Sequence, residues 1–275
     1  MKVILITGAS SGLGKAVGDY LTSRGHTVYG TSRQPSSITD SRFPLVPLDL
    51  NRPETIAACV ASVIEKAGRI DVLVNNAGVG ILGPLEEIPS DALRAHFETN
   101  LFGPIDVIKA VLPHMRNKRS GLIINITSIA GYMGLPFRGP YSASKGAFEL
   151  ISEALRMEVK PFGIEVCNLA PGEFATDIAS RRYNTALQPD SAYAETYGRT
   201  VALVNQHVSG GNDPIMVAHT IEKIMETRQP AVHYKVGPFL SRFSIVLKRL
   251  LPDRMYERML MKHYQLELPT GRKKA

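Results

Sequence analysis

The sequence predicts an α/β fold in which helices cover both faces of a doubly wound, parallel sheet of about seven strands. Two observations predict this fold class. Segments with the pattern of strands alternate with segments with the pattern of helices along most of the 275 residues. The strand-like segments are apolar throughout, which is typical of strands buried on both faces. The chain is long enough for one large domain, and no internal repeat or low-complexity linker divides it.

The elements follow one another with clear boundaries. The first strand, 2–6, is a short apolar run that ends in a glycine-rich turn, which favours a strand over a signal peptide. Further strands are predicted at 27–33, 45–48, 71–75, 121–127, 163–169 and 231–236. Helices are predicted at 15–24, 53–67, 141–159 and 214–227, with two more inside 90–118. The helix at 53–67 follows Asn51 and has Pro53 in its first turn, where proline is well tolerated.

The turn after the first strand has the composition of an anion site. It reads Thr-Gly-x-x-x-Gly-x-Gly over residues 7–14 and leads directly into a helix. Glycines let the backbone approach a phosphate, and the N–H groups and dipole of the helix start attract negative charge. The alternative is a tight turn without a ligand. The residues that we expect to bind a nucleotide here are Gly8, Ser10, Ser11, Gly12, Leu13 and Gly14.

Tyr141 and Lys145 are the strongest candidates for chemistry. They lie four residues apart on a predicted helix and therefore share one face. A tyrosine is a weak acid at neutral pH, and an adjacent ammonium favours its phenolate form. Such a pair is suited to donating and accepting a proton. The alternative is an ordinary solvated helix face.

The motifs together resemble those of the short-chain dehydrogenase/reductase family, in its conventional branch. The resemblance covers residues 1–236, which we expect to form a Rossmann-type catalytic domain, with 237–275 as a C-terminal helical extension. Tyr-x-x-x-Lys and the glycine turn are joined, in the family's order, by Asp49-Leu50, Asn75-Asn76-Ala77-Gly78, Asn100, Ser128, Pro171-Gly172 and Thr176. Ser128 precedes Tyr141 by thirteen residues. No departure from the catalytic pattern is found.

The resemblance implies a role for each of these positions. It implies a catalytic tetrad of Asn100, Ser128, Tyr141 and Lys145. Ser128 and Tyr141 would bind the carbonyl oxygen as negative charge develops on it. Lys145 would also bind the nicotinamide ribose, and Asn100 would hold a water that links Lys145 to solvent. The remaining positions would contact the cofactor: Asp49 and Leu50 at the adenine, Asn76, Ala77, Gly78, Pro171 and Gly172 along it, and Thr176 at the nicotinamide amide. No metal is expected.

The end of the second strand bears on the choice of cofactor. A carboxylate there would bind the ribose hydroxyls of NAD(H) and repel a 2′-phosphate. This chain has Thr-Ser-Arg at 31–33 instead, and no acid before Asp40. Arg33 can pair with a phosphate through its planar fork of donors, and Lys15 offers a second positive charge. The sequence therefore predicts NADP(H) rather than NAD(H), although both side chains could also be ordinary solvated cations. Because cells keep NADPH reduced, we expect reduction to be the physiological direction.

Two segments are expected to form the substrate pocket. The loop 129–138 is apolar and aromatic, and the run 177–213 has helical patterns and a flexible Gly210-Gly211 exit suited to a lid. The apolar loop favours a largely apolar ketone or aldehyde over a charged substrate, and the C-terminal extension loosely resembles those of family members that act on steroids, retinoids or long-chain lipid ketones. Arg181 and Arg182 are read as surface arginines rather than as an anion site.

The C-terminal extension carries most of the positive charge of the chain. Residues 228–275 contain eleven Lys and Arg against three Asp and Glu, so their net charge is +8, against +7 for the whole chain. Apolar residues recur there at helical spacing, on both sides of Pro252. Two basic amphipathic helices are predicted, which either lie on an anionic membrane surface, cap the active site, or pack on the domain or a partner subunit.

The remaining expectations concern the setting of the protein. Cys59 and Cys167 form no metal or redox spacing, so we expect reduced thiols and a cytoplasmic protein, with possible peripheral membrane contact. No stretch approaches the ~20 apolar residues that a membrane span needs. The basic pI suggests nucleic-acid binding, but no such motif is present and no nucleic-acid partner is expected. The family habit implies a homodimer or homotetramer built through 90–118 and 141–159. The alternatives in function are an NADP-linked alcohol dehydrogenase that works oxidatively and a non-catalytic cofactor sensor.

Overall fold

A seven-stranded parallel sheet forms the centre of the computed structural model, which describes residues 1–174 and 181–266. The strand order is β3-β2-β1-β4-β6-β7-β9, and every neighbouring pair is parallel. The strands are β1 (Val3–Ile6), β2 (Thr27–Ser32), β3 (Leu45–Pro47), β4 (Val72–Asn75), β6 (Gly121–Ile126), β7 (Ile164–Pro171) and β9 (His233–Val236). The order reverses between β1 and β4, where sheets of this kind bind ligands at the carboxyl ends of their strands. The predicted fold class is confirmed.

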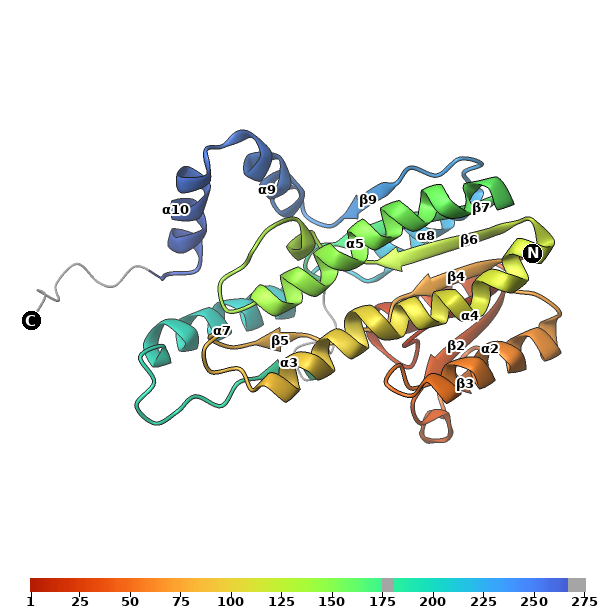
Figure 1. The fold of residues 1–275 in the computed structure, drawn as a ribbon, viewed down its shortest axis with the longest axis horizontal. Helices are drawn as coiled ribbons and strands as arrows, with labels where there is room; N and C mark the ends of the chain where they lie inside the picture. Colours follow the sequence, from red (N-terminus) through yellow and green to blue (C-terminus); the bar gives the residue numbers. More distant parts are fainter. Residues whose placement is uncertain (175–180, 267–275) are drawn as a thin grey trace, which may run out of the picture.

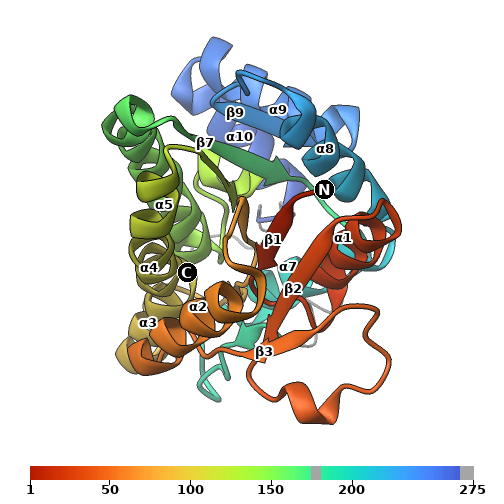
Figure 2. The same cartoon turned by 90° about the vertical axis from the view of Figure 1, so that its right-hand side faces the viewer.

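Helices cover both faces of the sheet (Figure 2). One face carries α2 (Pro53–Ala67), α4 (Gly103–Lys118) and α5 (Gly139–Val159), and the other carries α1 (Gly12–Ser23) and α8 (Ile215–Glu226). A separate apolar core fills each side, because strand residues point alternately to one face and the other. Ile4 and Leu5 illustrate this alternation: both are completely buried, and they belong to different cores.

The segment 90–118 contains two helices, but no loop separates them. The helix α3 (Ser90–Phe97) passes into a π-helical turn, Glu98–Phe102, which passes directly into α4. A π turn contains one residue more than an α turn and occurs frequently at functional sites. The sequence pattern did not predict it, and it contains Asn100.

The smaller elements gather at the carboxyl end of the sheet (Figure 1). Two short strands, β5 (Ile81–Leu82) and β8 (Tyr183–Asn184), pair in parallel. With two residues each, they are too short to leave a periodic pattern in the sequence from which they could be predicted. The helices α7 (Ala194–Ser209), α9 (Phe239–Leu250) and α10 (Asp253–His263) lie at the same end. Within the described ranges 1–174 and 181–266, no helix is both long and apolar enough to cross a membrane.

Candidate active site and cofactor cradle

The glycine turn after β1 lies against the end of β4, at distances that only glycine permits. Gly8 has a φ of +65°, and a Cβ atom there would lie 2.9 Å from the Cα atom of Ala77. A Cβ on Gly14 would lie 2.5 Å from the side-chain nitrogen of Asn76 and closer still to the carbonyl oxygen of Gly8. The two glycines therefore allow the turn, the start of α1 and the end of β4 to meet at one point.

Hydrogen bonds hold this turn in position. Asn76 Nδ2 donates to the carbonyl oxygens of Thr7, at 2.9 Å, and Gly8, at 3.1 Å. The Thr7 hydroxyl accepts from the backbone N–H groups of Asn76 and Ala77, both at 3.0 Å. The Asn76 side chain thus orients the glycine turn. Thr7 opens the predicted motif, but its hydroxyl was not among the predicted binding groups.

The turn fits a phosphate at the start of α1. Ser11 is the N-cap, with an extended backbone, and its side chain makes no capping hydrogen bond. The first N–H groups of a helix have no partner within the helix, and Lys15 is the first residue here whose N–H bonds back, to the carbonyl oxygen of Ser11 at 3.2 Å. The N–H groups of Gly12, Leu13 and Gly14 precede it, so they can donate to a bound anion.

The residues expected at the adenosine end lie on β2 and after β3. Asp49 Oδ1 accepts from the N–H of Asn51 at 3.0 Å, and Leu50 is buried. Arg33 is exposed and, among the described residues, makes no ion pair. Lys15 is already engaged: its ammonium lies 3.2 Å from Asp19 and 3.5 Å from Asp40. Of the two cations expected at a 2′-phosphate, Arg33 is therefore the one without a carboxylate partner in the part of the chain that the structure describes.

Tyr141 and Lys145 are both buried, at 9% and 5% exposure. The alternative of a solvated helix face is therefore wrong. Lys145 Nζ donates to the carbonyl oxygen of Ile126, at the end of β6, over 2.9 Å. Burial lowers the pKa of Lys145 to about 8. A lysine with this pKa remains largely charged at neutral pH and loses its proton under mildly basic conditions.

Asn100 and Lys145 meet at Gly78. The completely buried Asn100 accepts from the N–H of Val79 and donates to the carbonyl oxygen of the same residue, both at 2.8 Å. A Cβ atom on Gly78 would lie 3.2 Å from Asn100 Oδ1 and 3.4 Å from Lys145 Nζ. Three of the predicted site residues, which come from three different elements, are thus brought together.

A histidine that the motifs did not predict completes this cluster. His96 is 4% exposed, and its Nε2 atom lies 3.2 Å from Asn100 Nδ2 and 3.0 Å from the hydroxyl of Ser144. Because an amide nitrogen only donates, His96 Nε2 accepts this hydrogen bond and the neutral ring carries its proton on Nδ1. Burial, assisted by the charge of Lys145, lowers the pKa of His96 to about 4. In the sequence, the one feature that could have pointed to His96 is its position four residues before Asn100, on the same helix face.

Ser128 lies just beyond β6 and caps a short 3₁₀ helix, Ile129–Tyr132, by accepting from the N–H of Ala130 at 3.1 Å. This short helix contacts α5 where two glycines face each other. A Cβ on Gly146 would lie 2.9 Å from the carbonyl oxygen of Gly131. Since Gly146 follows Lys145, this close contact fixes Ser128 beside the helix that carries Tyr141 and Lys145.

Pro171 and Gly172 close the site at the end of β7. The N–H of Gly172 donates to the carbonyl oxygen of Val236, at 2.8 Å, so the turn is tied to the end of β9. Thr176 lies outside the described residues. Every other predicted site residue lies at the carboxyl end of the sheet or on a helix that adjoins it.

The surroundings of the Tyr141 ring are largely apolar. The Tyr141 ring packs in a cluster with Ile81, Ile88 and Ala130. The guanidinium of Arg138 lies 5.3 Å from the centre of the same ring. Further out, the loop after Ser128 contributes to two larger apolar clusters. The first contains Met133, Ile245 and Tyr256, and the second contains Phe137, Tyr197 and Tyr264.

Arg182, which was read as a surface arginine, is partly enclosed. Its side-chain stem packs on Gly80, and it donates to Asn184 at 2.9 Å and to Asn205 at 2.8 Å. Burial lowers its pKa. Arg181 is exposed, as expected.

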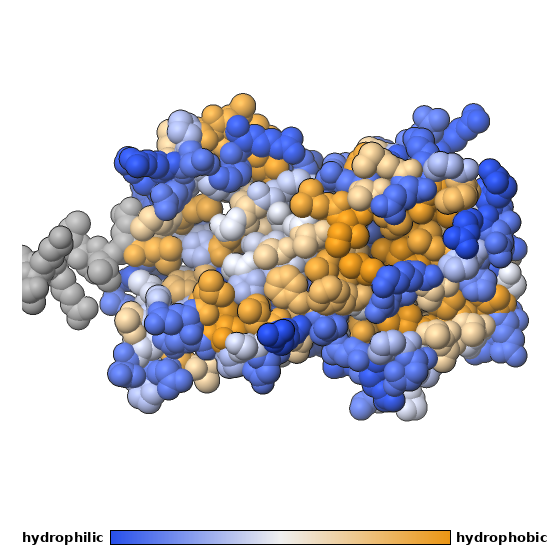
Figure 3. All heavy atoms as spheres, viewed as in Figure 1, coloured by the Kyte–Doolittle hydropathy of each residue, from blue (hydrophilic) through white to orange (hydrophobic). Residues whose placement is uncertain are grey.

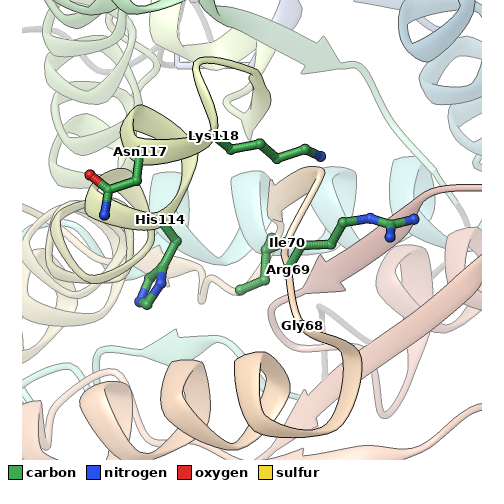
Figure 4. A pocket seen from close by; sticks show the side chains of 6 residues that line it. All are labelled: Gly68, Arg69, Ile70, His114, Asn117 and Lys118. Atoms are coloured by element: carbon green, nitrogen blue, oxygen red, sulfur yellow. The ribbon is translucent and has the colours of Figure 1, made fainter.

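A shallow pocket at the opposite end of the sheet is separate from this site. Figure 4 shows its lining side chains, which come from the loop before β4 and the end of α4. They are Gly68, Arg69, Ile70, His114, Asn117 and Lys118. Two of the cations there, Arg69 and Lys118, already pair with Asp71, so the pocket contributes nothing to the chemistry above.

Comparisons with known proteins agree with the geometry. The short chain dehydrogenase family model matches residues 2–186. The chain is 40% identical to a 3-ketodihydrosphingosine reductase of Bacteroides thetaiotaomicron, over 96% of this chain and 98% of that protein. It is 30% identical to an NADPH-dependent 3-dehydrocapnine reductase of Ornithobacterium rhinotracheale, over 95% of this chain and 97% of that protein. A short-chain dehydrogenase of Streptomyces avermitilis superposes with a TM-score of 0.80 at 34% identity, covering 97% of this chain and 98% of that one. The protein therefore belongs to the short-chain dehydrogenase/reductase family and is a nucleotide-binding oxidoreductase.

Proposed function

We propose that the protein is an NADP(H)-dependent reductase that converts a ketone or aldehyde group on a largely apolar, lipid-like substrate into an alcohol. The observation that carries the proposal is the convergence at Gly78 of Asn100 and a buried Lys145, one helical turn from Tyr141. Burying the four polar side chains of Asn100, Ser128, Tyr141 and Lys145 costs folding free energy. Buried polar groups that gather in this way are typical of functional sites. A cofactor-sensing protein has no need of all four.

In this proposal a bound nicotinamide cofactor supplies the hydride. Ser128 and Tyr141 donate hydrogen bonds to the carbonyl oxygen, and Tyr141 transfers its proton to that oxygen. The ammonium of Lys145 stabilises the negative charge left on the phenol oxygen. The Ile126 carbonyl holds Lys145 in a buried site, where solvent screens its charge little.

The proton that Tyr141 loses is replaced through Lys145. By family resemblance, Asn100 would hold a water that connects Lys145 to solvent. The hydrogen bonds of Asn100 to Val79 and His96 support this role, since they fix the π turn in which Asn100 lies.

NADP(H) is the cofactor that we propose. Arg33, directly after β2, has no ion-pair partner within residues 1–174 and 181–266, and it stands at the position where NAD-dependent enzymes have a carboxylate. The NADPH dependence of the 3-dehydrocapnine reductase supports the same choice.

A long-chain ketone is the substrate class that we propose. The apolar clusters beside Tyr141 offer a path for an aliphatic chain. The names of two relatives, a 3-ketodihydrosphingosine reductase and a 3-dehydrocapnine reductase, support a substrate with a ketone at the third position.

We also propose a homodimer or homotetramer, formed through α4 and α5. Large apolar side chains are exposed on or beside these helices, and Figure 3 shows hydrophobic atoms along their outer face. They are Phe102, Leu150, Ile151, Met157 and Phe162. The buried thiols of Cys59 and Cys167 are compatible with the cytoplasmic location that we propose.

The test is NADPH oxidation by the wild type and by Tyr141→Phe, with ketones from short polar ones to long-chain 3-keto lipids. We expect turnover of the apolar substrates and its loss in the variant, while NADPH binding, followed by fluorescence, is retained. NADPH binding without turnover of any ketone would favour the cofactor sensor. Turnover only of alcohols with NADP⁺ would favour the oxidative dehydrogenase.

A further inference from the structure

The helix α9 has one side buried and the other exposed. Ile245 is 2% exposed and packs with Ile129 and Met133 of the loop after Ser128. On the opposite side, five large apolar side chains face solvent. They are Phe239, Leu240, Phe243, Val246 and Leu250, with exposures of 71%, 71%, 38%, 43% and 75%. We call these five residues the α9 apolar face.

The α9 apolar face is continuous along the helix. At 100° per residue its members occupy an arc centred roughly opposite Ile245. The rings of Phe239 and Phe243 stack at 5.5 Å, which makes one flat apolar surface at the start of the helix. Figure 3 shows hydrophobic atoms over the position of α9, with hydrophilic atoms on either side. Exposed apolar surface on this scale, rimmed by polar groups, marks an interaction site.

Positive charge borders this face. Arg242 and Arg249 are exposed, and α9 contains no Asp or Glu. Lys248, on the other side of the helix, is paired with Asp253 at 3.0 Å. Between residues 237 and 266 there are six Lys and Arg and two Asp and Glu, a net charge of +4. An apolar face bordered by cations is complementary to the surface of an anionic bilayer, where apolar side chains enter the acyl boundary and cations meet the headgroups.

The charge also disfavours a second copy of this chain as the occupant. A symmetric contact through the α9 apolar face would bring the arginines of one copy close to those of the other, with no acidic residue on either helix. The α5 helix, by contrast, carries both signs of charge around its exposed Leu150 and Met157, which suits contact between subunits.

The position of α9 connects this surface to the site. A Cβ atom on Gly172 would lie 3.4 Å from the Cβ of Ser241 and 3.5 Å from Pro238, so the first turn of α9 touches the turn after β7. The buried side of the same helix packs on the loop after Ser128. A membrane bound to α9 would therefore lie close to the turn at Gly172 and to the loop after Ser128, which both border the site.

We propose that the α9 apolar face docks the protein onto anionic phospholipid membranes, with Arg242 and Arg249 at the headgroups. The helix lies flat in the interface and holds the entrance of the site at the bilayer, so that an apolar substrate passes from lipid to Tyr141 without crossing water. Docking itself does not depend on the proposed function, whereas this route of delivery does.

Co-sedimentation of the full-length protein with vesicles tests the docking. The vesicles are phosphatidylcholine alone or mixed with phosphatidylglycerol, at low and at high salt. We expect the wild type to pellet only with the anionic vesicles, and less at high salt. Leu250→Ser is compared with Leu85→Ser, because the two leucines are 75% and 72% exposed and their substitution disturbs no core. Only Leu250→Ser is expected to weaken pelleting, and the triple variant Phe239→Ser, Leu240→Ser and Leu250→Ser is expected to abolish it.

Arg242→Gln with Arg249→Gln is expected to weaken binding to anionic vesicles by about tenfold or more. The matched control, Lys66→Gln with Lys223→Gln, removes two exposed charges on other helices and is expected to leave binding unchanged. Turnover of a short, water-soluble ketone measures the proposed function independently, and we expect it to be equal in all of these variants. Three results would overturn the docking: a wild type that stays in the supernatant, pelleting that the triple variant does not alter, and a triple variant whose mass in solution without vesicles is lower than that of the wild type.

Discussion

His96 and Asn100 lie one helical turn apart, and the 3.2 Å hydrogen bond between their side chains joins the end of α3 to the π turn. The same nitrogen of His96 lies 3.0 Å from the hydroxyl of Ser144 on α5, whose single proton can go to this nitrogen or to the carbonyl oxygen of Tyr141, 2.9 Å away. His96 is therefore a positioning residue that connects two of the proposed catalytic residues through buried polar contacts.

Replacing His96 tests this positioning. Because His96→Leu removes an acceptor of Asn100 Nδ2, we expect kcat to fall by about tenfold, which corresponds to one buried hydrogen bond. The KM for NADPH is expected to change little, since His96 does not line the glycine turn. His96→Gln keeps a side-chain acceptor and is expected to recover most of the activity. Steady-state kinetics of both variants measures this, and equal losses in the two would contradict the role.

Acid is expected to destabilise the protein through the same histidine. The pKa of His96 is lowered from 6.5 to about 4 in the folded state, so between these values the unfolded chain binds a proton that the folded protein does not. The contribution of neutral His96 to the free energy of unfolding is thus fully present above pH 6.5. It falls as the pH decreases towards 4, by up to about 3 kcal/mol. The charged group that faces His96 is Lys145, and Tyr141 is the neighbouring phenol. Urea unfolding of the wild type and of His96→Gln at pH 7 and pH 5 measures this, and an equal loss of stability in both would show that other groups are responsible.

The pKa of Lys145 sets the expected pH dependence of reduction. This pKa is lowered from 10.5 to about 8 by burial, so the ammonium is lost as the pH rises through 8. We expect kcat/KM for the ketone to fall above about pH 8, because an uncharged amine no longer stabilises the phenolate. Stability is expected to change in the opposite direction: between pH 8 and 10.5 the unfolded chain holds the extra proton, so the free energy of unfolding rises with pH. A pH–rate profile that stays flat to pH 10 would contradict the assignment.

Arg33→Gln tests the choice of cofactor. Loss of a charge-assisted contact with a 2′-phosphate is expected to raise the KM for NADPH by about tenfold or more, with no change in the KM for NADH. Arg52→Gln is a suitable control, because Arg52 is exposed and pairs only locally, with Glu54. An equal rise in the KM for NADPH and for NADH in Arg33→Gln would show that Arg33 does not bind the 2′-phosphate.

The sequence alone was sufficient for the local features of this fold. The strands and most helices lie within a few residues of their predicted positions, since apolar periodicity reports directly on which residues are buried. The shared face of Tyr141 and Lys145 and the anion-binding character of the glycine turn also follow from local geometry. Helical spacing and the freedom of glycine are properties of a few consecutive residues.

The tertiary structure decided what depends on residues that are distant in sequence. His96 contacts Ser144 across 48 positions, and Lys15 is paired with Asp40 rather than left available to a phosphate. The apolar pattern of α9 predicted an amphipathic helix, but only its packing on Ile129 and Met133 determined that Ile245 is buried while Phe239 and Leu250 are exposed. Periodicity specifies the faces of a helix, whereas the neighbour that covers each face is chosen by the packing of the whole chain.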